Sequence, residues 1–147
     1  MIGQPSRRPW RHLLILLLAT VLCAAAACGP AQNPLDATSW RLVSIQNENG
    51  DVVDSVPGSV VTLGFQTDNA AGMAGCNNYS GSYSVSGDGL KFGPLNTTRQ
   101  ACPDVNVMKQ ESTYLAALEK VERFKMESDR LELLDGGRHT LLVFGPP

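Results

Sequence analysis

Apolar and polar residues alternate in several short segments of the chain, which is typical of β-strands with one buried face. In residues 60–65, for example, Val61, Leu63 and Phe65 share one face. The other segments with strand character are residues 39–45, 82–86, 90–92, 124–127, 130–133 and 140–144. The last of these is apolar after Thr140, which predicts a strand buried on both faces. Glycine-containing turns separate several segments, so the pattern predicts a curved antiparallel sheet or a barrel.

One stretch has a helical pattern instead. Residues 104–121 contain no glycine, and Asp104 can cap the first turn of a helix there. The apolar residues near helical spacing are Met108, Tyr114, Leu115, Leu118 and Val121. The acidic residues assigned to the exposed surface are Glu111, Glu119 and Glu122. We therefore predict an α+β fold: a small curved antiparallel β-sheet, or barrel-like β-domain, with one packed α-helix.

The N-terminal residues have the pattern of an export signal. Arg7, Arg8 and Arg11 precede an apolar run that continues to Ala27. This run is shorter than the ~20 residues of a membrane span, and its end is rich in small residues. We interpret residues 1–27 as a signal peptide, residues 28–38 as a tether and residues 39–147 as one domain.

Cys28 follows directly after this run. The residues Ala26-Ala27-Cys28-Gly29 resemble the lipobox of bacterial lipoproteins, although Ala25 stands where leucine is usual. The resemblance implies a lipid on Cys28, and hence a protein attached to the membrane and facing the periplasm or the cell exterior. The alternative is an ordinary secreted protein that is cut near Ala27 and carries Cys28 by chance.

Charge and cysteine count refine this picture. After residues 1–27 are removed, nine Lys and Arg residues face fourteen Asp and Glu residues, a formal net charge of −5. An acidic domain argues against nucleic-acid binding. The remaining cysteines are Cys28, Cys76 and Cys102. If Cys28 carries lipid, Cys76 and Cys102 are left to form a disulfide, although two separate buried thiols are the alternative.

No group of residues suggests catalysis. His139 is the single histidine after the signal peptide, and its place in a turn favours a solvent-exposed side chain. No serine has the spacing of a nucleophile elbow, and no Cys and His spacing suggests zinc. We therefore expect a protein that is not an enzyme and needs no metal or cofactor.

Three blocks of sequence together resemble the META domain family, the HslJ-like lipoproteins. These are the segment beginning Ser39-Trp40-Arg41-Leu42, residues 75–83 with Gly75-Cys76-Asn77-Asn78-Tyr79, and residues 92–103 with Thr97-Thr98-Arg99-Gln100-Ala101-Cys102. The resemblance implies a small antiparallel β-structure with one helix, and an envelope location in many bacterial members. It also implies a link to heat shock and antibiotic tolerance, but no reaction.

The two cysteine-containing blocks also indicate a candidate binding surface. A Cys76–Cys102 bridge would gather amides, a phenol and a guanidinium, which suit recognition of a saccharide, peptide or carboxylate. The residues of this patch are Asn77, Asn78, Tyr79, Thr98, Arg99 and Gln100. In the alternative interpretation, the asparagines satisfy turn backbone and Arg99 pairs with a nearby carboxylate.

These features predict a non-enzymatic, lipid-anchored envelope protein. It would bind an unknown protein or small-molecule partner in envelope stress or drug tolerance. The alternative function is inhibition of a periplasmic or host hydrolase, which requires a rigid exposed loop. Residues 66–74 are the loop that the sequence offers for that role.

Overall fold

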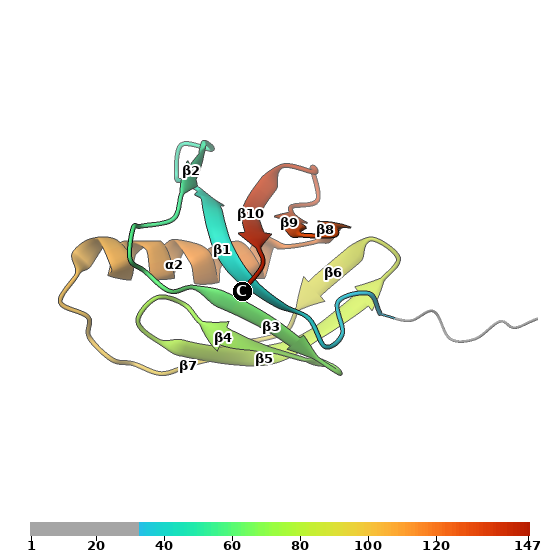
Figure 1. Cartoon of the computed structure of the whole chain (residues 1–147), viewed down its shortest axis with the longest axis horizontal. Helices are drawn as coiled ribbons and strands as arrows, with labels where there is room; N and C mark the ends of the chain where they lie inside the picture. The colour runs from blue at the N-terminus through green and yellow to red at the C-terminus, as the bar shows by residue number, and fades with distance from the viewer. Residues whose placement is uncertain (1–32) are drawn as a thin grey trace, which may run out of the picture. The chain divides into compact units, whose positions relative to one another are not determined.

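The computed structural model describes residues 33–147, so the predicted signal peptide and Cys28 lie outside the described residues. The described chain contains ten strands and one helix (Figure 1). Their bounds are β1 (Ser39–Gln46), β2 (Val52–Asp54), β3 (Thr62–Gln66), β4 (Asn69–Met73), β5 (Asn78–Ser86), β6 (Gly89–Phe92), β7 (Asn96–Thr97), α2 (Val105–Lys120), β8 (Arg123–Glu127), β9 (Arg130–Leu134) and β10 (Thr140–Gly145). Within residues 33–147, no helix is both long and apolar enough to cross a membrane.

Eight of the strands form a closed antiparallel barrel in the order β1-β3-β4-β5-β6-β8-β9-β10. The barrel closes because β1 pairs with β3 on one side and with β10 on the other. Trp40 lies opposite Leu63, and Leu42 lies opposite Phe144. The short strands β2 and β7 pair only with β1 and β5. The predicted α+β fold, with a barrel-like sheet and one helix, is confirmed.

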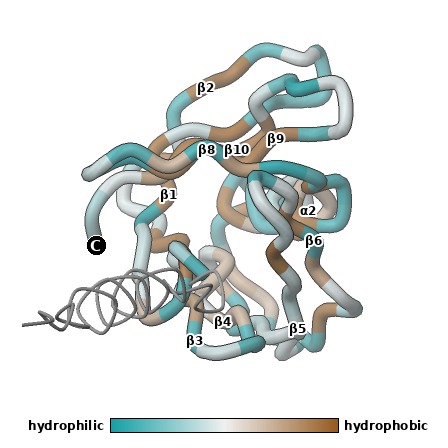
Figure 2. The backbone as a smooth tube through the Cα atoms, turned by 90° about the vertical axis from the view of Figure 1, so that its right-hand side faces the viewer, coloured by the Kyte–Doolittle hydropathy of each residue, from teal (hydrophilic) through white to brown (hydrophobic). Residues whose placement is uncertain are grey.

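Alternating side chains of the strands fill the barrel. The alternation predicted around β3 is confirmed, because Val61, Leu63 and Phe65 are 2%, 0% and 2% exposed. In β10 every residue from Leu141 to Phe144 is buried, as the apolar sequence predicted. Figure 2 shows hydrophobic residues recurring along β1, β9 and β10, whereas hydrophilic residues gather in the turns. Complete burial of one such side chain stabilises a fold by roughly 1.5–3 kcal/mol.

Helix α2 begins and ends as the sequence predicted. The Asp104 carboxylate accepts hydrogen bonds from the backbone N–H groups of Asn106 and Val107, and Val121 is the C-terminal cap. The helix lies against β6 and β10 (Figure 2). Within the barrel, β6 lies between β5 and β8, and it pairs with β8 through a single residue pair, Gly89 and Arg123. The helix therefore packs beside the narrowest strand pairing of the barrel.

The assignment of Glu111 to the exposed surface of the helix is wrong. Glu111 is only 7% exposed, whereas Glu119 and Glu122 are exposed as predicted. Residues three and seven positions apart share one face of a helix. Glu111 is related in this way to Tyr114 and Leu118, which are both completely buried. Helical geometry thus places this carboxylate on the face that meets the barrel.

Residues 33–38, which the sequence assigned to a tether, pack against the barrel instead. Leu35 is completely buried, and the Asn33 side-chain amide donates a hydrogen bond of 2.8 Å to the Tyr83 hydroxyl. The Thr38 hydroxyl donates to the Leu35 carbonyl at 2.6 Å. A single apolar residue within a polar stretch supplies no periodic pattern, so the sequence did not indicate this segment as part of the domain.

The prediction of an exposed loop at residues 66–74 is also wrong, because most of this segment forms strand β4. β4 pairs with β3 on one side and with β5 on the other. Its sequence, Asn-Ala-Ala-Gly-Met, has weak strand propensity, so pairing on both sides overrides the local preference. Gly72 is required there, since a Cβ atom would lie 2.0 Å from the Thr62 carbonyl oxygen.

Replacing a buried residue of α2 is expected to destabilise the fold strongly. Leu118→Ala removes a completely buried side chain and leaves a cavity, so the free energy of unfolding should fall by about 2–5 kcal/mol. Urea unfolding followed by circular dichroism measures this. Val105→Ala is the control on the same helix, because Val105 is 75% exposed and its change should stay within about 0.5 kcal/mol. Similar losses for both variants would contradict the packing described.

Candidate functional site

The Glu111 carboxylate joins the helix to the loop before β5. Its Oε2 atom accepts hydrogen bonds from the backbone N–H groups of Cys76 at 3.0 Å and Asn77 at 2.7 Å. Its Oε1 atom accepts one from the Asn77 side-chain amide at 2.7 Å. Within residues 33–147, no basic side chain forms an ion pair with Glu111. Since an uncompensated buried charge costs several kcal/mol, these three bonds are what permits the carboxylate to be buried.

Asn77 connects this carboxylate to the loop after β7. Its Oδ1 atom accepts hydrogen bonds from the Thr98 hydroxyl at 2.8 Å and the Gln100 backbone N–H at 2.7 Å. Its Nδ2 group donates to the Gln100 carbonyl at 3.1 Å as well as to Glu111. The amide thus uses both of its donors and two acceptor positions within the protein. We call Asn77 and Glu111 together the polar hub.

The residues around the hub explain the Gly75-Cys76-Asn77 sequence. Gly75 has φ of 118°, a conformation that favours glycine, and an added Cβ atom would lie 3.1 Å from Val107 of the helix. Cys76 forms a disulfide with Cys102, with a Cα–Cα distance of 6.1 Å. The bridge and the hub therefore connect the same two loops side by side.

The six residues of the predicted patch lie in one region, but they differ in exposure. Asn77 and Tyr79 are only 4% and 3% exposed, so they do not belong to a surface patch. The structural interpretation of the first asparagine is therefore the one that the geometry supports. The residues of the patch that remain exposed are Asn78, Thr98, Arg99 and Gln100.

Tyr79 serves the core through its hydroxyl group. It donates to the Thr62 carbonyl at 2.8 Å and lies 2.6 Å from the Tyr114 hydroxyl, which is then the donor of that second bond. The two rings also pack edge to face, with centroids 5.6 Å apart. Burial is the main cause that raises the pKa of both hydroxyl groups above the ordinary value of 10.0. Both tyrosines are therefore neutral at physiological pH.

Residues 98–102, here called the stapled segment, are exposed except at Cys102 and form no helix, turn or bend. The Thr98 backbone N–H donates to the Asn78 carbonyl at 3.0 Å, which extends the β5–β7 pairing by one residue. Two residues on, Gln100 is held by Asn77 through both its N–H and its carbonyl. Arg99 lies between these fixed points, and its guanidinium forms no ion pair within the described chain.

His139 lies in the β9–β10 turn, and its side chain is 72% exposed. Its backbone N–H donates to Asp135 at 2.8 Å, and its Nδ1 atom lies 3.0 Å from the same carboxylate. The backbone hydrogen bond, followed by the side-chain one, lowers the pKa of Asp135. This contact stabilises the turn.

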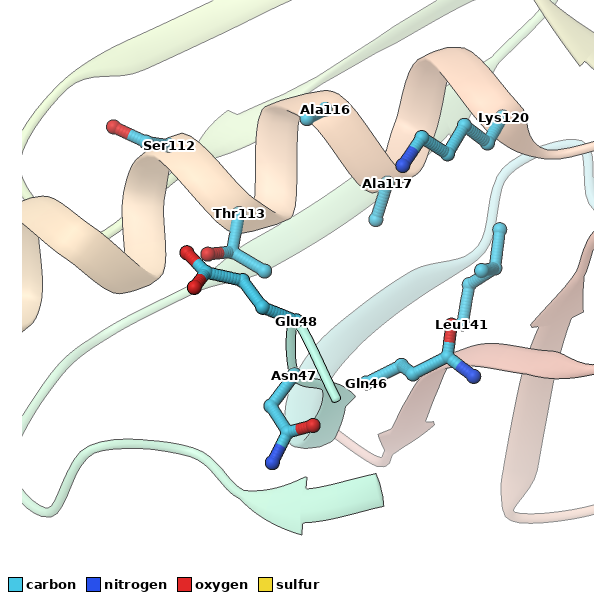
Figure 3. Close-up of a pocket in the computed structure, with 9 residues that line it drawn as sticks. All are labelled: Gln46, Asn47, Glu48, Ser112, Thr113, Ala116, Ala117, Lys120 and Leu141. Carbon is cyan, nitrogen blue, oxygen red and sulfur yellow. The ribbon is translucent and has the colours of Figure 1, made fainter. Parts of the chain in front are cut away.

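A second candidate site, which the sequence did not indicate, lies where the end of β1 faces α2. It is an open pocket of about 280 Å³ (Figure 3). In Figure 3 the Glu48 carboxylate lies beside Thr113, and the Lys120 side chain extends back along the helix toward Ala117. The pocket is lined by Gln46, Asn47, Glu48, Ser112, Thr113, Ala116, Ala117, Lys120 and Leu141. This mixture of amides, hydroxyls and both charges can contact a small polar or zwitterionic molecule.

Neither site has the residues of a metal centre. Among residues 33–147, no group of three or more His, Cys, Asp or Glu side chains is arranged to hold a metal ion. The polar pocket has one carboxylate and one ammonium group, and the stapled segment has one guanidinium. The chemistry that these surfaces offer is hydrogen bonding and charge pairing.

A closed eight-stranded barrel with one helix, joined by a buried polar hub, defines residues 33–147 as a small β-barrel domain. The model of the META domain matches residues 33–146. The chain belongs to the META domain family, as the resemblance of the three sequence blocks implied.

Solved structures support the same fold. A protein from Burkholderia xenovorans, determined by NMR, is 30% identical with a TM-score of 0.64, covering 84% of this chain and 96% of that one. A second NMR structure is 20% identical with a TM-score of 0.58, covering 76% and 90%. A DUF4847 family protein from Bacteroides vulgatus, determined by crystallography, is 12% identical with a TM-score of 0.54, covering 78% and 95%. No curated protein matches the chain.

Changing the hub carboxylate to an amide is expected to destabilise the protein. In Glu111→Gln, one accepting oxygen becomes an NH₂ group that faces N–H donors, and the remaining bonds lose their charge. The free energy of unfolding should fall by about 2–3 kcal/mol, measured by urea unfolding. Glu119→Gln makes the same change at an exposed position of α2 and should cost less than about 0.5 kcal/mol. Equal effects would contradict a special role for Glu111.

The buried tyrosine pair predicts a loss of stability at alkaline pH. Folding keeps both hydroxyl groups protonated, so their contribution is complete below the ordinary pKa of 10.0. As the pH rises further, tyrosines of the unfolded chain lose protons while the buried ones retain theirs, and stability falls. Urea midpoints measured from about pH 8 to about pH 11 test this. A Tyr79→Phe, Tyr114→Phe double variant should show a shallower decline, and an unchanged slope would contradict the assignment.

Proposed function

We propose that this chain is an exported, lipid-anchored envelope protein that acts by binding a partner through the exposed part of the predicted patch. The observation that carries the proposal is the position of exposed Arg99 between two residues that are both hydrogen-bonded to the interior, Thr98 through its hydroxyl and Gln100 through its backbone. Thr98 and Gln100 are both tied to the buried Asn77. A surface that is already ordered loses little conformational freedom when a partner binds.

The chemistry of this surface suits recognition of an acidic or carbonyl-rich partner. Arg99 offers a planar set of N–H donors that can bind a carboxylate with two parallel hydrogen bonds. Asn78 and Gln100 are exposed beside it and add amide donors and acceptors. Arginine is one of the residue types enriched among the residues that carry most of the binding energy of an interface.

The buried polar groups support binding more than catalysis. Asn77, Glu111 and Tyr79 are the reactive or polar side chains nearest to the exposed patch, and each is engaged in hydrogen bonds within the fold. A general base or nucleophile has to reach its substrate, whereas these side chains are at most 7% exposed. We therefore assign them to the scaffold.

Attachment through Cys28 follows from the sequence pattern and lies outside the described residues. A lipid there would leave only a few residues between the membrane and Asn33, where the domain begins. The barrel would then remain close to the membrane surface. The link to heat shock and antibiotic tolerance that the family resemblance implies supports a partner that acts in the response of the envelope to stress.

The second candidate function is inhibition of a hydrolase. The sequence predicted the inhibitory loop at residues 66–74, but strand β4 occupies residues 69–73 of that segment. The observation that favours this function is a different segment: residues 98–102 form no helix, turn or bend, are mostly exposed and are attached to the interior.

The anchor and the binding surface can be tested separately. For the anchor, the intact mass of the protein from native membranes should begin at Cys28 and include acyl groups. Reduction with thiol alkylation should reveal two further cysteines, Cys76 and Cys102. An unlipidated mass in the soluble fraction would contradict the anchor.

For the surface, a deletion strain is complemented with the wild type, Arg99→Ala, Asn78→Ala or Arg138→Ala, and survival under heat and envelope-acting drugs is measured. Photo-crosslinking from position 101 identifies the partner in the same cells. Arg99→Ala should weaken partner binding at least about tenfold, because it removes the central charged contact. Arg138→Ala changes another exposed arginine, in the β9–β10 turn, and should behave as wild type. Normal survival and crosslinking by folded Arg99→Ala would overturn the proposal.

A further inference from the structure

We infer that the stapled segment is a substrate-like inhibitory loop for a serine protease that cleaves after arginine, with Arg99 as the side chain that enters the specificity pocket. The inference rests on the second candidate function and names its target class and its reacting bond, Arg99–Gln100.

The first observation is the conformation of the segment. Proteases bind the residues around the scissile bond as an extended strand, through main-chain hydrogen bonds and pockets for side chains. β7 ends at Thr97, and residues 98–102 then continue without turn or bend until Pro103. No residue of this stretch has a positive φ. These features are compatible with the extended backbone that a protease accepts.

The second observation is where the segment is held and where it is free. The Thr98 N–H donates to Asn78, the Thr98 hydroxyl donates to Asn77, and Gln100 bonds to Asn77 through both backbone groups. The backbone groups of Arg99 form no hydrogen bond within residues 33–147. Anchors on both sides and a free central residue preorganise the loop while leaving the groups that a protease must contact available.

The third observation is that the chain on the C-terminal side of the Arg99–Gln100 bond is held to the rest of the protein, so cleavage of this bond would not release it. The protease serine hydroxyl would add to the Arg99 carbonyl carbon, the Arg99–Gln100 C–N bond would break, and the protease histidine would pass the serine proton to the Gln100 nitrogen. That nitrogen is the atom held 2.7 Å from Asn77 Oδ1, and Cys102 is tied to Cys76 two residues on. The new amine of Gln100 would therefore remain beside the acyl-enzyme. It could attack the ester and re-form the peptide bond before water hydrolyses the acyl-enzyme.

Charge selects the protease class. A trypsin-like specificity pocket has an aspartate at its base, and a guanidinium can bind its carboxylate with two hydrogen bonds. Arg99 is exposed and forms no ion pair within the described residues, so its charge is available. Its neighbours Thr98 and Gln100 are uncharged.

The test uses the full exported protein titrated against trypsin, with chymotrypsin as the matched enzyme of different specificity. Wild type should inhibit trypsin in a tight, near-equimolar manner and leave chymotrypsin active. Arg99→Lys should retain inhibition, whereas Arg99→Ala should weaken it at least about 100-fold. Arg99→Phe should move inhibition from trypsin to chymotrypsin. Arg138→Ala should inhibit trypsin as the wild type does.

A second variant separates inhibition from simple resistance to digestion. Thr98→Val removes the hydroxyl that bonds to Asn77 at an exposed position, so the fold should persist while the loop loosens. We expect this variant to inhibit more weakly and to be cut faster at Arg99–Gln100, as mass spectrometry of the reduced chain would show. Rapid hydrolysis of the wild type at this bond without inhibition would overturn the inference, and so would absence of both inhibition and cleavage.

These outcomes are distinct from failure of the proposed function. If trypsin is not inhibited but Arg99→Ala still abolishes crosslinking to a cellular partner, the loop binds another class of protein and only this inference fails. If Arg99→Ala changes neither readout, the binding surface itself is wrong.

Discussion

The structure depends on a buried carboxylate. Glu111 enters the protein on the helix face that also carries Tyr114 and Leu118, so apolar packing of α2 brings its charge out of water. The charge is tolerated because the backbone of Cys76 and Asn77 and the Asn77 amide all donate to it. The helix can therefore dock only where this loop is formed, and the loop is satisfied only when the helix is docked.

The same interaction also holds the exposed stapled segment, residues 98–102, in place. The Asn77 Nδ2 group donates to both Glu111 and the Gln100 carbonyl, and its Oδ1 atom accepts from the Gln100 N–H. The Cys76–Cys102 disulfide links the two loops covalently beside these bonds. A surface segment without helix or paired strand is thus held by contacts from the interior. This arrangement explains how a small barrel presents an arginine in a defined position without a bulky supporting domain.

The sequence predicted the barrel better than it predicted the site. Strict alternation, as in Val61, Leu63 and Phe65, reports burial directly, so the strands could be found. β4 was missed because Ala70, Ala71 and Gly72 have no strand propensity of their own, and their neighbours in space supply the pairing.

The acidic residue type predicts an exposed Glu111, whereas its position on the helix predicts the burial that the structure shows. Its spacing from Tyr114 and Leu118 was the signal that could have identified it as buried. The pocket beside Lys120 had no such signal, since it depends on how the helix docks against the end of β1. The sequence also carried no signal that Asn77 is buried and Asn78 exposed, because this difference arises where the bend at Asn77 passes into the first residue of β5.

Membership of the META family explains the scaffold of this protein but does not identify its partner. Gly75, Cys76, Asn77 and Cys102, which contribute to the resemblance, are engaged in a close backbone approach, the hub or the disulfide. Arg99 lies between such residues, but its guanidinium forms no ion pair within the described chain. The same hub could therefore hold a different side chain at this position without loss of the fold. Specificity in such a barrel is expected to reside in the exposed residue that the scaffold leaves free, and in this chain that residue is an arginine.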